Sequence, residues 1–201
     1  MIINIRGTNG SGKSTLAASF IKDDAETVTL VTYPKPTKRK PENTKDVVGY
    51  LSNWKDLGTV CVVGPYDGPI GGLDRIANFA LQREAIRAAT KIADTVICEG
   101  VLASTVFSSW ADFFEEMGDV AILYLDTPLE TCYERIRQRQ IKATGEEKAI
   151  KTDQVAQKVK MIESTRRRFD ERGLRTHLIS GNDGGTFVEQ IIKESRAKGS
   201  V

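Results

Sequence analysis

The chain has 201 residues, 40% of them hydrophobic and 28% charged, and its 29 basic and 27 acidic side chains leave a net charge of +2. This length predicts one domain, or one domain with an insertion, and the near-neutral charge by itself does not indicate a nucleic-acid binder. No run reaches about 18 apolar residues, which excludes a membrane span, and three cysteines among apolar neighbours indicate free thiols in a reducing compartment. We therefore expect a cytoplasmic α/β or α+β protein.

The first predicted elements enclose a phosphate-binding motif. Residues 1–5 form a short apolar run that predicts a buried strand, and residues 12–22 suit a helix. Between them the sequence reads GTNGSGKS, the GxxxxGK[ST] pattern of the P-loop in its required strand–helix context. Glycines let the backbone approach a phosphate, and loop N–H groups with the helix N-terminus form an anion site. The predicted nucleotide-binding residues are Gly7, Thr8, Asn9, Gly10, Ser11, Gly12, Lys13, Ser14 and Thr15.

Two of these residues carry predicted chemical roles in phosphoryl transfer. Lys13 would bring positive charge to the β- and γ-phosphates of a nucleotide, and the Ser14 hydroxyl would ligate Mg²⁺. The sequence therefore predicts ATP and Mg²⁺ as cofactors, with Lys13 as a catalytic residue.

A strand is predicted at residues 27–33, which are rich in β-branched side chains. Residues 34–43 then read PKPTKRKPEN, and the three prolines exclude a regular helix and predict an exposed loop. The loop carries four basic residues, Lys35, Lys38, Arg39 and Lys40. It fits either a solvated surface or a contact with a polyanionic substrate.

Three carboxylates follow the next two predicted strands, at 59–63 and 95–98. Asp67 and Asp74 lie in the segment GPYDGPIGGLDR at 64–75, and Glu99 ends the later strand. Ligands of open α/β sheets lie at the carboxyl ends of strands, so all three could line one cleft. Asp67 and Asp74 are candidates for the base or orienter that a hydroxyl acceptor needs, and Glu99 for holding a Mg²⁺-bound water. The segment could also be a simple glycine-proline surface turn.

The remaining chain continues to alternate helices and strands. Helices are predicted at 77–93, 105–117, 128–141, 150–172 and 185–197, and strands at 120–125 and 175–179. This order predicts a three-layer α/β fold, a parallel sheet with helices on both faces. Pro128 suits the first turn of its helix after a capping Thr127.

These motifs together resemble the P-loop kinases that act on nucleosides, nucleotides and small molecules. The resemblance rests on Gly7–Ser14, on VICEG at 96–100 and on LYLDTPLETCYERIRQRQ at 123–140. It implies one P-loop kinase domain over 1–201 with a short lid around 137–150. It further implies lid contacts from Arg139 and Arg135, with the triplet at 166–168 as a weaker candidate, and Asn182 beside the nucleotide base.

The segment GPYDGPIGGLD also resembles phage-type P-loop kinases, including those that act on hydroxymethylated pyrimidines, some within DNA. The implied activity is ATP-dependent transfer of the γ-phosphoryl group to a nucleoside, a nucleotide or a modified DNA base such as 5-hydroxymethyluracil. The single Glu99 argues against the AAA+ ATPases, which expect an acidic pair at that place. A P-loop ATPase or nucleotide-binding switch acting with a protein or DNA partner stays open as the alternative.

Overall fold

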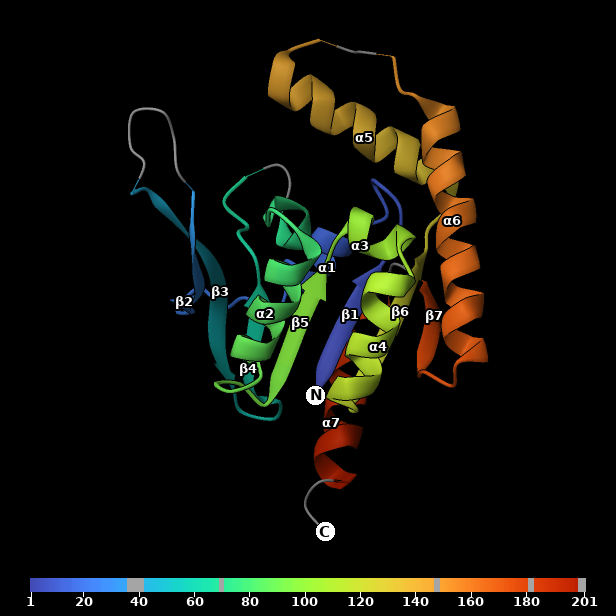
Figure 1. The fold of residues 1–201 in the computed structure, drawn as a ribbon. Helices are drawn as coiled ribbons and strands as arrows, with labels where there is room; N and C mark the ends of the chain where they lie inside the picture. Colours follow the sequence, from blue (N-terminus) through green and yellow to red (C-terminus); the bar gives the residue numbers. More distant parts are fainter. Residues whose placement is uncertain (36–41, 69–70, 147–148, 181–182, 199–201) are drawn as a thin grey trace.

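The computed structural model describes residues 1–35, 42–68, 71–146, 149–180 and 183–198. The described residues form one seven-stranded sheet in the order β2-β3-β4-β5-β1-β6-β7 (Figure 1). Its strands are β1 (Ile2–Arg6), β2 (Glu26–Pro34), β3 (Thr44–Trp54), β4 (Gly58–Val63), β5 (Thr95–Glu99), β6 (Val120–Asp126) and β7 (Thr176–Ser180). Strands β4 to β7 with β1 are parallel, as predicted, whereas β2 and β3 run antiparallel to their neighbours.

The helices cover both faces of the sheet, which confirms the predicted three-layer α/β fold. They are α1 (Lys13–Ala18), α2 (Phe79–Ala89), α3 (Val101–Thr105), α4 (Ser108–Met117), α5 (Leu129–Thr144), α6 (Thr152–Glu171) and α7 (Gly184–Lys198), with a 3₁₀ turn η1 at Gly72–Arg75. Among these described elements, no helix is both long enough and apolar enough to cross a membrane.

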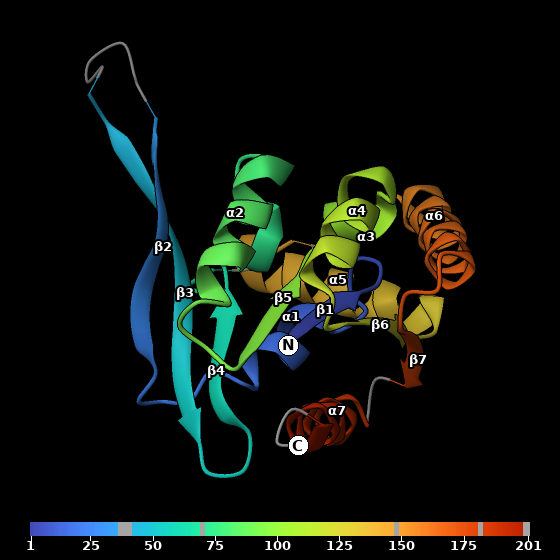
Figure 2. The ribbon, with the colours of Figure 1, turned by 60° about the horizontal axis from the view of Figure 1, so that its bottom comes forward.

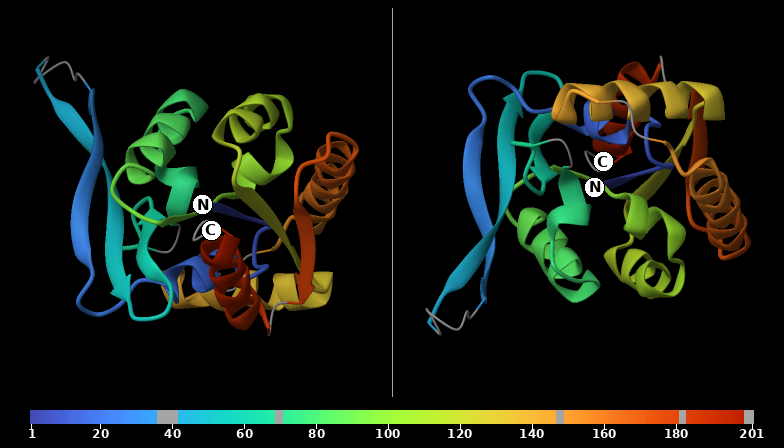
Figure 3. Two further views of the ribbon diagram at one scale, coloured as in Figure 1. Left: turned by 90° about the horizontal axis from the view of Figure 1, so that it is seen from below. Right: turned by 90° about the horizontal axis from the view of Figure 1, so that it is seen from above.

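Alternate strand residues build two separate cores. Ile2 and Ile122 face a core shared with α2, α3, α4 and α6, whereas Ile3 and Leu123 face a second core shared with α1 and α7. This alternation follows from the pleat of a strand, in which successive side chains point to opposite faces. Helix α5 belongs to neither layer: it lies across the ends of the strands, above the P-loop (Figure 3).

Strand β3 was not predicted. With β2 it forms a long hairpin at one edge of the sheet, beside α2 (Figure 2). Gly49 lies in the middle of β3 and argues against a strand in the sequence, because a glycine inside a strand usually weakens that strand. Here a Cβ at Gly49 would lie 2.9 Å from Cys61 Sγ and 3.0 Å from Leu30 Cδ1. Glycine therefore lets the side chains of Cys61 and Leu30 pack closely against the backbone of β3. Residues 38–40 of the predicted basic loop lie outside the described residues.

Two predicted helices differ from the structure. The helix at 105–117 is two helices, α3 and α4, and the first starts as early as Val101. Helix α5 starts at Leu129 with Pro128 as its N-cap, and Thr127 does not cap it. Thr127 instead donates its hydroxyl hydrogen bond to the Ser11 carbonyl, at 2.9 Å, and so joins the start of α5 to the P-loop.

Candidate active site

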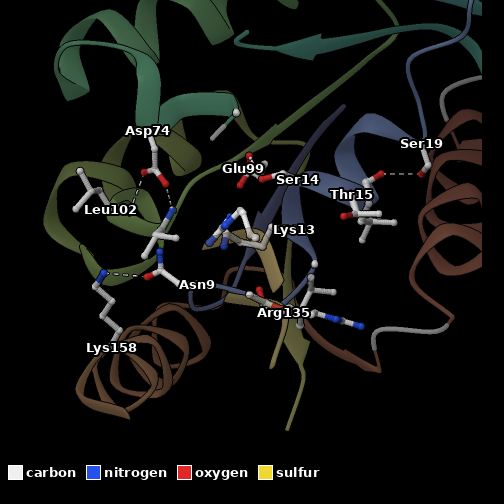
Figure 4. Close-up of a pocket in the computed structure, with 18 of the residues that line it drawn as sticks. Asn9, Lys13, Ser14, Thr15, Ser19, Asp74, Glu99, Leu102, Arg135 and Lys158 are labelled. Atoms are coloured by element: carbon white, nitrogen blue, oxygen red, sulfur yellow. Dashed lines mark hydrogen bonds between the residues drawn. The ribbon is translucent and has the colours of Figure 1, made fainter. Parts of the chain in front are cut away.

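A cavity of about 960 Å³ opens where β1, β5 and β6 end (Figure 4). The P-loop forms its floor, and side chains from η1, α3, α5 and α6 form its walls. Of the predicted nucleotide-binding residues, 9–15 line the cavity. Gly7 and Thr8 are buried and do not line it, and Asn182 falls outside the described residues.

Two glycines of the P-loop are required, both by the backbone conformation of the loop and by the close approach of helix α5. Gly10 and Gly12 have φ of +77° and +100°, where residues with a Cβ are strained. A Cβ at Gly10 would also collide with the backbone of Cys132 in α5. The glycines therefore let α5 rest directly on the loop, where Arg135 Nη1 donates to the Gly10 carbonyl at 3.3 Å.

The lysine of the loop is buried in the cavity floor. Lys13 is 5% exposed, and its Nζ donates to the Thr8 carbonyl at 2.9 Å. Burial lowers the pKa of Lys13, and the nearby Glu99 carboxylate opposes that shift. A cation desolvated in this way gains most from an anionic ligand, which fits the predicted triphosphate site.

Glu99 accepts a hydrogen bond from Ser14 Oγ to its Oε1, at 2.9 Å. The carboxylate is 1% exposed, and burial raises the pKa of Glu99 to about 6 although Lys13 and the Ser14 hydrogen bond lower it. This hydroxyl and carboxylate are hard oxygen ligands of the kind that suits Mg²⁺. Among the described residues, no group of three or more His, Cys, Asp or Glu side chains is arranged to hold a metal ion.

The structure separates the two aspartates of the segment 64–75. Asp74 lines the cavity, and its carboxylate accepts from the backbone N–H groups of Val101 at 2.7 Å and Leu102 at 3.0 Å. Asp67 is exposed, lies outside the cavity lining and pairs with Arg75, whose hydrogen bond lowers the pKa of Asp67. Of the three predicted carboxylates, Asp74 and Glu99 come together, and Asp67 does not join them.

Gly72 permits this meeting of Asp74 and Glu99. Its φ is +64°, and a Cβ there would lie 2.6 Å from the Glu99 carbonyl oxygen and 2.9 Å from its Cδ. The turn η1 therefore approaches the end of β5 more closely than any residue with a side chain would allow. Gly72 is thus required for the packing of the site.

The arginines of α5 also differ in whether they line the cavity. Arg135 and Arg139 line the cavity, whereas Arg137 pairs with Glu134. In the weaker candidate triplet, Arg168 stacks over the Phe107 ring at 4.0 Å and Arg166 pairs with Asp170, and none of the three lines the cavity.

Several cavity residues were not predicted, and two of them, Leu102 and Lys158, bear on the chemistry of the site. Leu102 of α3 is 56% exposed, and Lys158 of α6 donates from Nζ to Asn9 Oδ1 at 2.9 Å (Figure 4). Neither stands in a recognisable motif. A lysine in a helix usually belongs to a solvated face, so the sequence offered no signal for either residue.

Comparison with known proteins places the chain in a family. A family model described as AAA domain matches residues 2–164. The chain belongs to this family. No solved structure matches the chain.

Curated relatives of this AAA-domain chain share one name. The 5-hmdU DNA kinase of Pseudomonas phage M6 is 32% identical over 166 residues, which cover 82% of this chain and 82% of that protein. The 5-hmdU DNA kinase of Pseudomonas phage PaMx11 is 27% identical and covers 96% of this chain and 97% of its own length. That of Bacillus phage SP10 is 29% identical over 97% of this chain, which spans 30% of the phage protein.

These relatives confirm the predicted resemblance to P-loop kinases and the kinase class. The family description carries the AAA name. The relatives that share most of the chain are nevertheless named kinases, the class that the single Glu99 favoured over the AAA+ ATPases.

Lys13→Ala is expected to lower phosphoryl transfer by about 10²–10³-fold or more, because it removes a positioned charge from the transition state. The melting temperature should also fall, because the buried Glu99 carboxylate loses the positive charge beside it, although Lys13 packs in neither core. Transfer of label from [γ-³²P]ATP and a thermal melt measure the two effects. Full activity in this variant would contradict the assignment of the P-loop.

Gly72→Ala is expected to lower the free energy of unfolding by about 1–3 kcal/mol more than Gly118→Ala does, because its methyl group overpacks the end of β5. Gly118 is a matched control: its φ is +74°, and a Cβ there meets nothing within 4 Å. Urea denaturation gives both values. Equal losses in the two variants would show that the contact with Glu99 is not tight.

Proposed function

We propose that this chain transfers the γ-phosphoryl group of ATP to the hydroxyl of 5-hydroxymethyluracil in DNA. One observation carries the proposal. The P-loop pair Lys13 and Ser14, the buried Glu99 and the aspartate Asp74 meet in one cavity, in a chain whose relatives are named 5-hmdU DNA kinases. The cavity thus offers a triphosphate site and an acceptor site side by side.

On the donor side, the loop N–H groups and the N-terminus of α1 would cradle the phosphates of ATP. Lys13 would leave the Thr8 carbonyl for the β- and γ-phosphates, whose charge compensates for its burial. Mg²⁺, when bound at Ser14 with Glu99 beside it, neutralises charge on the phosphate oxygens. Arg135 and Arg139 reach the same cavity from α5 and would contact the phosphates when the lid around 137–150 closes.

On the acceptor side, Asp74 would orient the hydroxymethyl group. Both of its oxygens already accept from the backbone of α3, but a carboxylate has about four lone-pair sites and can accept further hydrogen bonds. The hydroxyl oxygen would form its bond to the γ-phosphorus as the bond to the β-phosphate oxygen breaks, and its proton would pass toward Asp74. The exposed Leu102, held beside Asp74 by the same hydrogen bonds, offers an apolar surface to a pyrimidine ring.

The depth of the site has a consequence for the DNA. Lys13 and Glu99 are almost wholly buried, so the reacting phosphate would lie below the protein surface. A base stacked inside a duplex does not reach such a point, and enzymes that act on bases take them out of the stack or use single strands. We therefore infer that the modified base enters the cavity in an unstacked form.

The test compares four acceptors with [γ-³²P]ATP: DNA with 5-hydroxymethyluracil, the same DNA with thymine, the free nucleoside and its monophosphate. Label is expected in the first DNA and not in the thymine DNA, which lacks the hydroxyl. Release of free phosphate at one rate with every acceptor would contradict the proposal and favour the ATPase or switch.

Asp74→Asn is expected to lower the rate of transfer by about 10²–10⁴-fold, the usual contribution of a positioned acid or base. The affinity for ATP should be retained, because Asp74 is assigned to the acceptor. Asp67→Asn is the control, since it removes a carboxylate from the same segment but outside the cavity, and it should change the rate little. If Asp67→Asn were the inactive variant and Asp74→Asn the active one, the acceptor would lie elsewhere.

A further inference from the structure

The cavity wall contributed by α6 holds a lysine that no motif assigns. Lys158 Nζ donates to Asn9 Oδ1 at 2.9 Å, across 149 residues of sequence (Figure 4). Asn9 follows Thr8, whose carbonyl accepts the hydrogen bond from Lys13. The two ammonium groups therefore bind adjacent residues of the P-loop, at the same end of the triphosphate site.

The partner of Lys158 is a neutral amide. Among the described residues no carboxylate forms an ion pair with Lys158, whereas Arg137, Arg166, Arg172 and Arg175 in the same part of the chain each pair with one. The side chain is half-buried in the cavity wall. A cation drawn out of water without a countercharge is unfavourable unless a ligand brings the charge. The ligand expected in this cavity is a nucleoside triphosphate.

Helix α6 fixes the position of this lysine. Ile162, Thr165 and Phe169 are buried against the core, and Thr165 Oγ1 donates to the Ser104 carbonyl at 3.0 Å. Lys158 lies four residues before Ile162, so both project from the same face of the helix. The lysine is thus delivered to the cavity by a helix that the core holds in place, and it needs no lid movement to reach the phosphates.

We propose that Lys158 binds the γ-phosphate of the bound triphosphate, exchanging the Asn9 amide for a phosphate oxygen when the nucleotide enters. This deepens the proposed function, because it assigns a second positioned cation to the group that is transferred. It names the γ-phosphate in particular because Lys158 and Lys13 share one end of the loop. A cation there stabilises the charge of the transferring group together with Lys13.

The first experiment measures binding and does not depend on the acceptor. Affinities for a non-hydrolysable ATP analogue and for ADP, both with Mg²⁺, are compared in the unchanged chain, Lys158→Met and Lys158→Arg. Loss of a charge-assisted hydrogen bond predicts that Lys158→Met weakens the ATP analogue by about tenfold or more, with little change for ADP. Lys158→Arg should restore most of the difference. This result would support the inference even if DNA proved not to be the acceptor.

A matched control tests the helix itself. Lys160 is exposed on the same helix and does not line the cavity, so Lys160→Met removes the same charge without touching the site. It should leave the affinities for ATP and ADP unchanged.

The kinetic experiment distinguishes a role of Lys158 toward the triphosphate from a role in binding DNA. Lys158→Met should lower kcat for DNA with 5-hydroxymethyluracil by about 10²–10³-fold, with little change in the KM for DNA. Three results would overturn the inference: equal weakening of ATP and ADP, which indicates a structural role through Asn9; the same losses in Lys160→Met; or a raised KM for DNA with unchanged ATP binding. The last would assign Lys158 to a backbone phosphate of the DNA.

Discussion

The buried carboxylate of Glu99 is the constraint on which the site depends. A carboxylate removed from water needs charge and hydrogen bonds around it, and Lys13 and the Ser14 hydroxyl supply them from the P-loop. On its other side Gly72 leaves room for η1, which brings Asp74 to the same cavity. The residues proposed for the donor and acceptor sides therefore meet because two separate segments, the P-loop and η1, pack against one side chain at the end of β5.

The two helices that wall the cavity are held in different ways. Helix α6 is anchored in the core, and its Phe169 ring lies 4.6 Å from the guanidinium carbon of Arg6, which also hydrogen-bonds Asn4 at 2.6 Å. This buried arginine ends β1 just before the P-loop, and it joins the loop's base to α6. Helix α5 buries Cys132 and Ile136 and rests on the P-loop through polar contacts. Such an element can separate from the loop at a lower cost in buried apolar area, which suits a lid.

The sequence alone predicted what depends on contiguous residues. The eight residues of the P-loop lie between a predicted strand and a predicted helix, and β5 and β6 are recognisable from their runs of apolar residues. Asp67 and Asp74 were equivalent in sequence, seven residues apart in one glycine-rich segment, and it takes the packing of η1 on Glu99 to separate them. Strand β3 was missed because the reason for Gly49, the close packing of side chains from the two neighbouring strands, is visible only in the folded sheet. Lys158 was missed because its contact with Asn9 joins residues 149 apart.

The central claim is that Asp74, and not Asp67, receives the hydroxyl that attacks the γ-phosphate. A structure of the chain with Mg²⁺, a non-hydrolysable ATP analogue and an oligonucleotide carrying 5-hydroxymethyluracil tests it most directly. We expect the modified base to lie unstacked in the cavity, with its hydroxyl hydrogen-bonded to Asp74 and directed at the γ-phosphorus. A base that stays stacked in the DNA, or a hydroxyl bound at Asp67 outside the cavity, would contradict it.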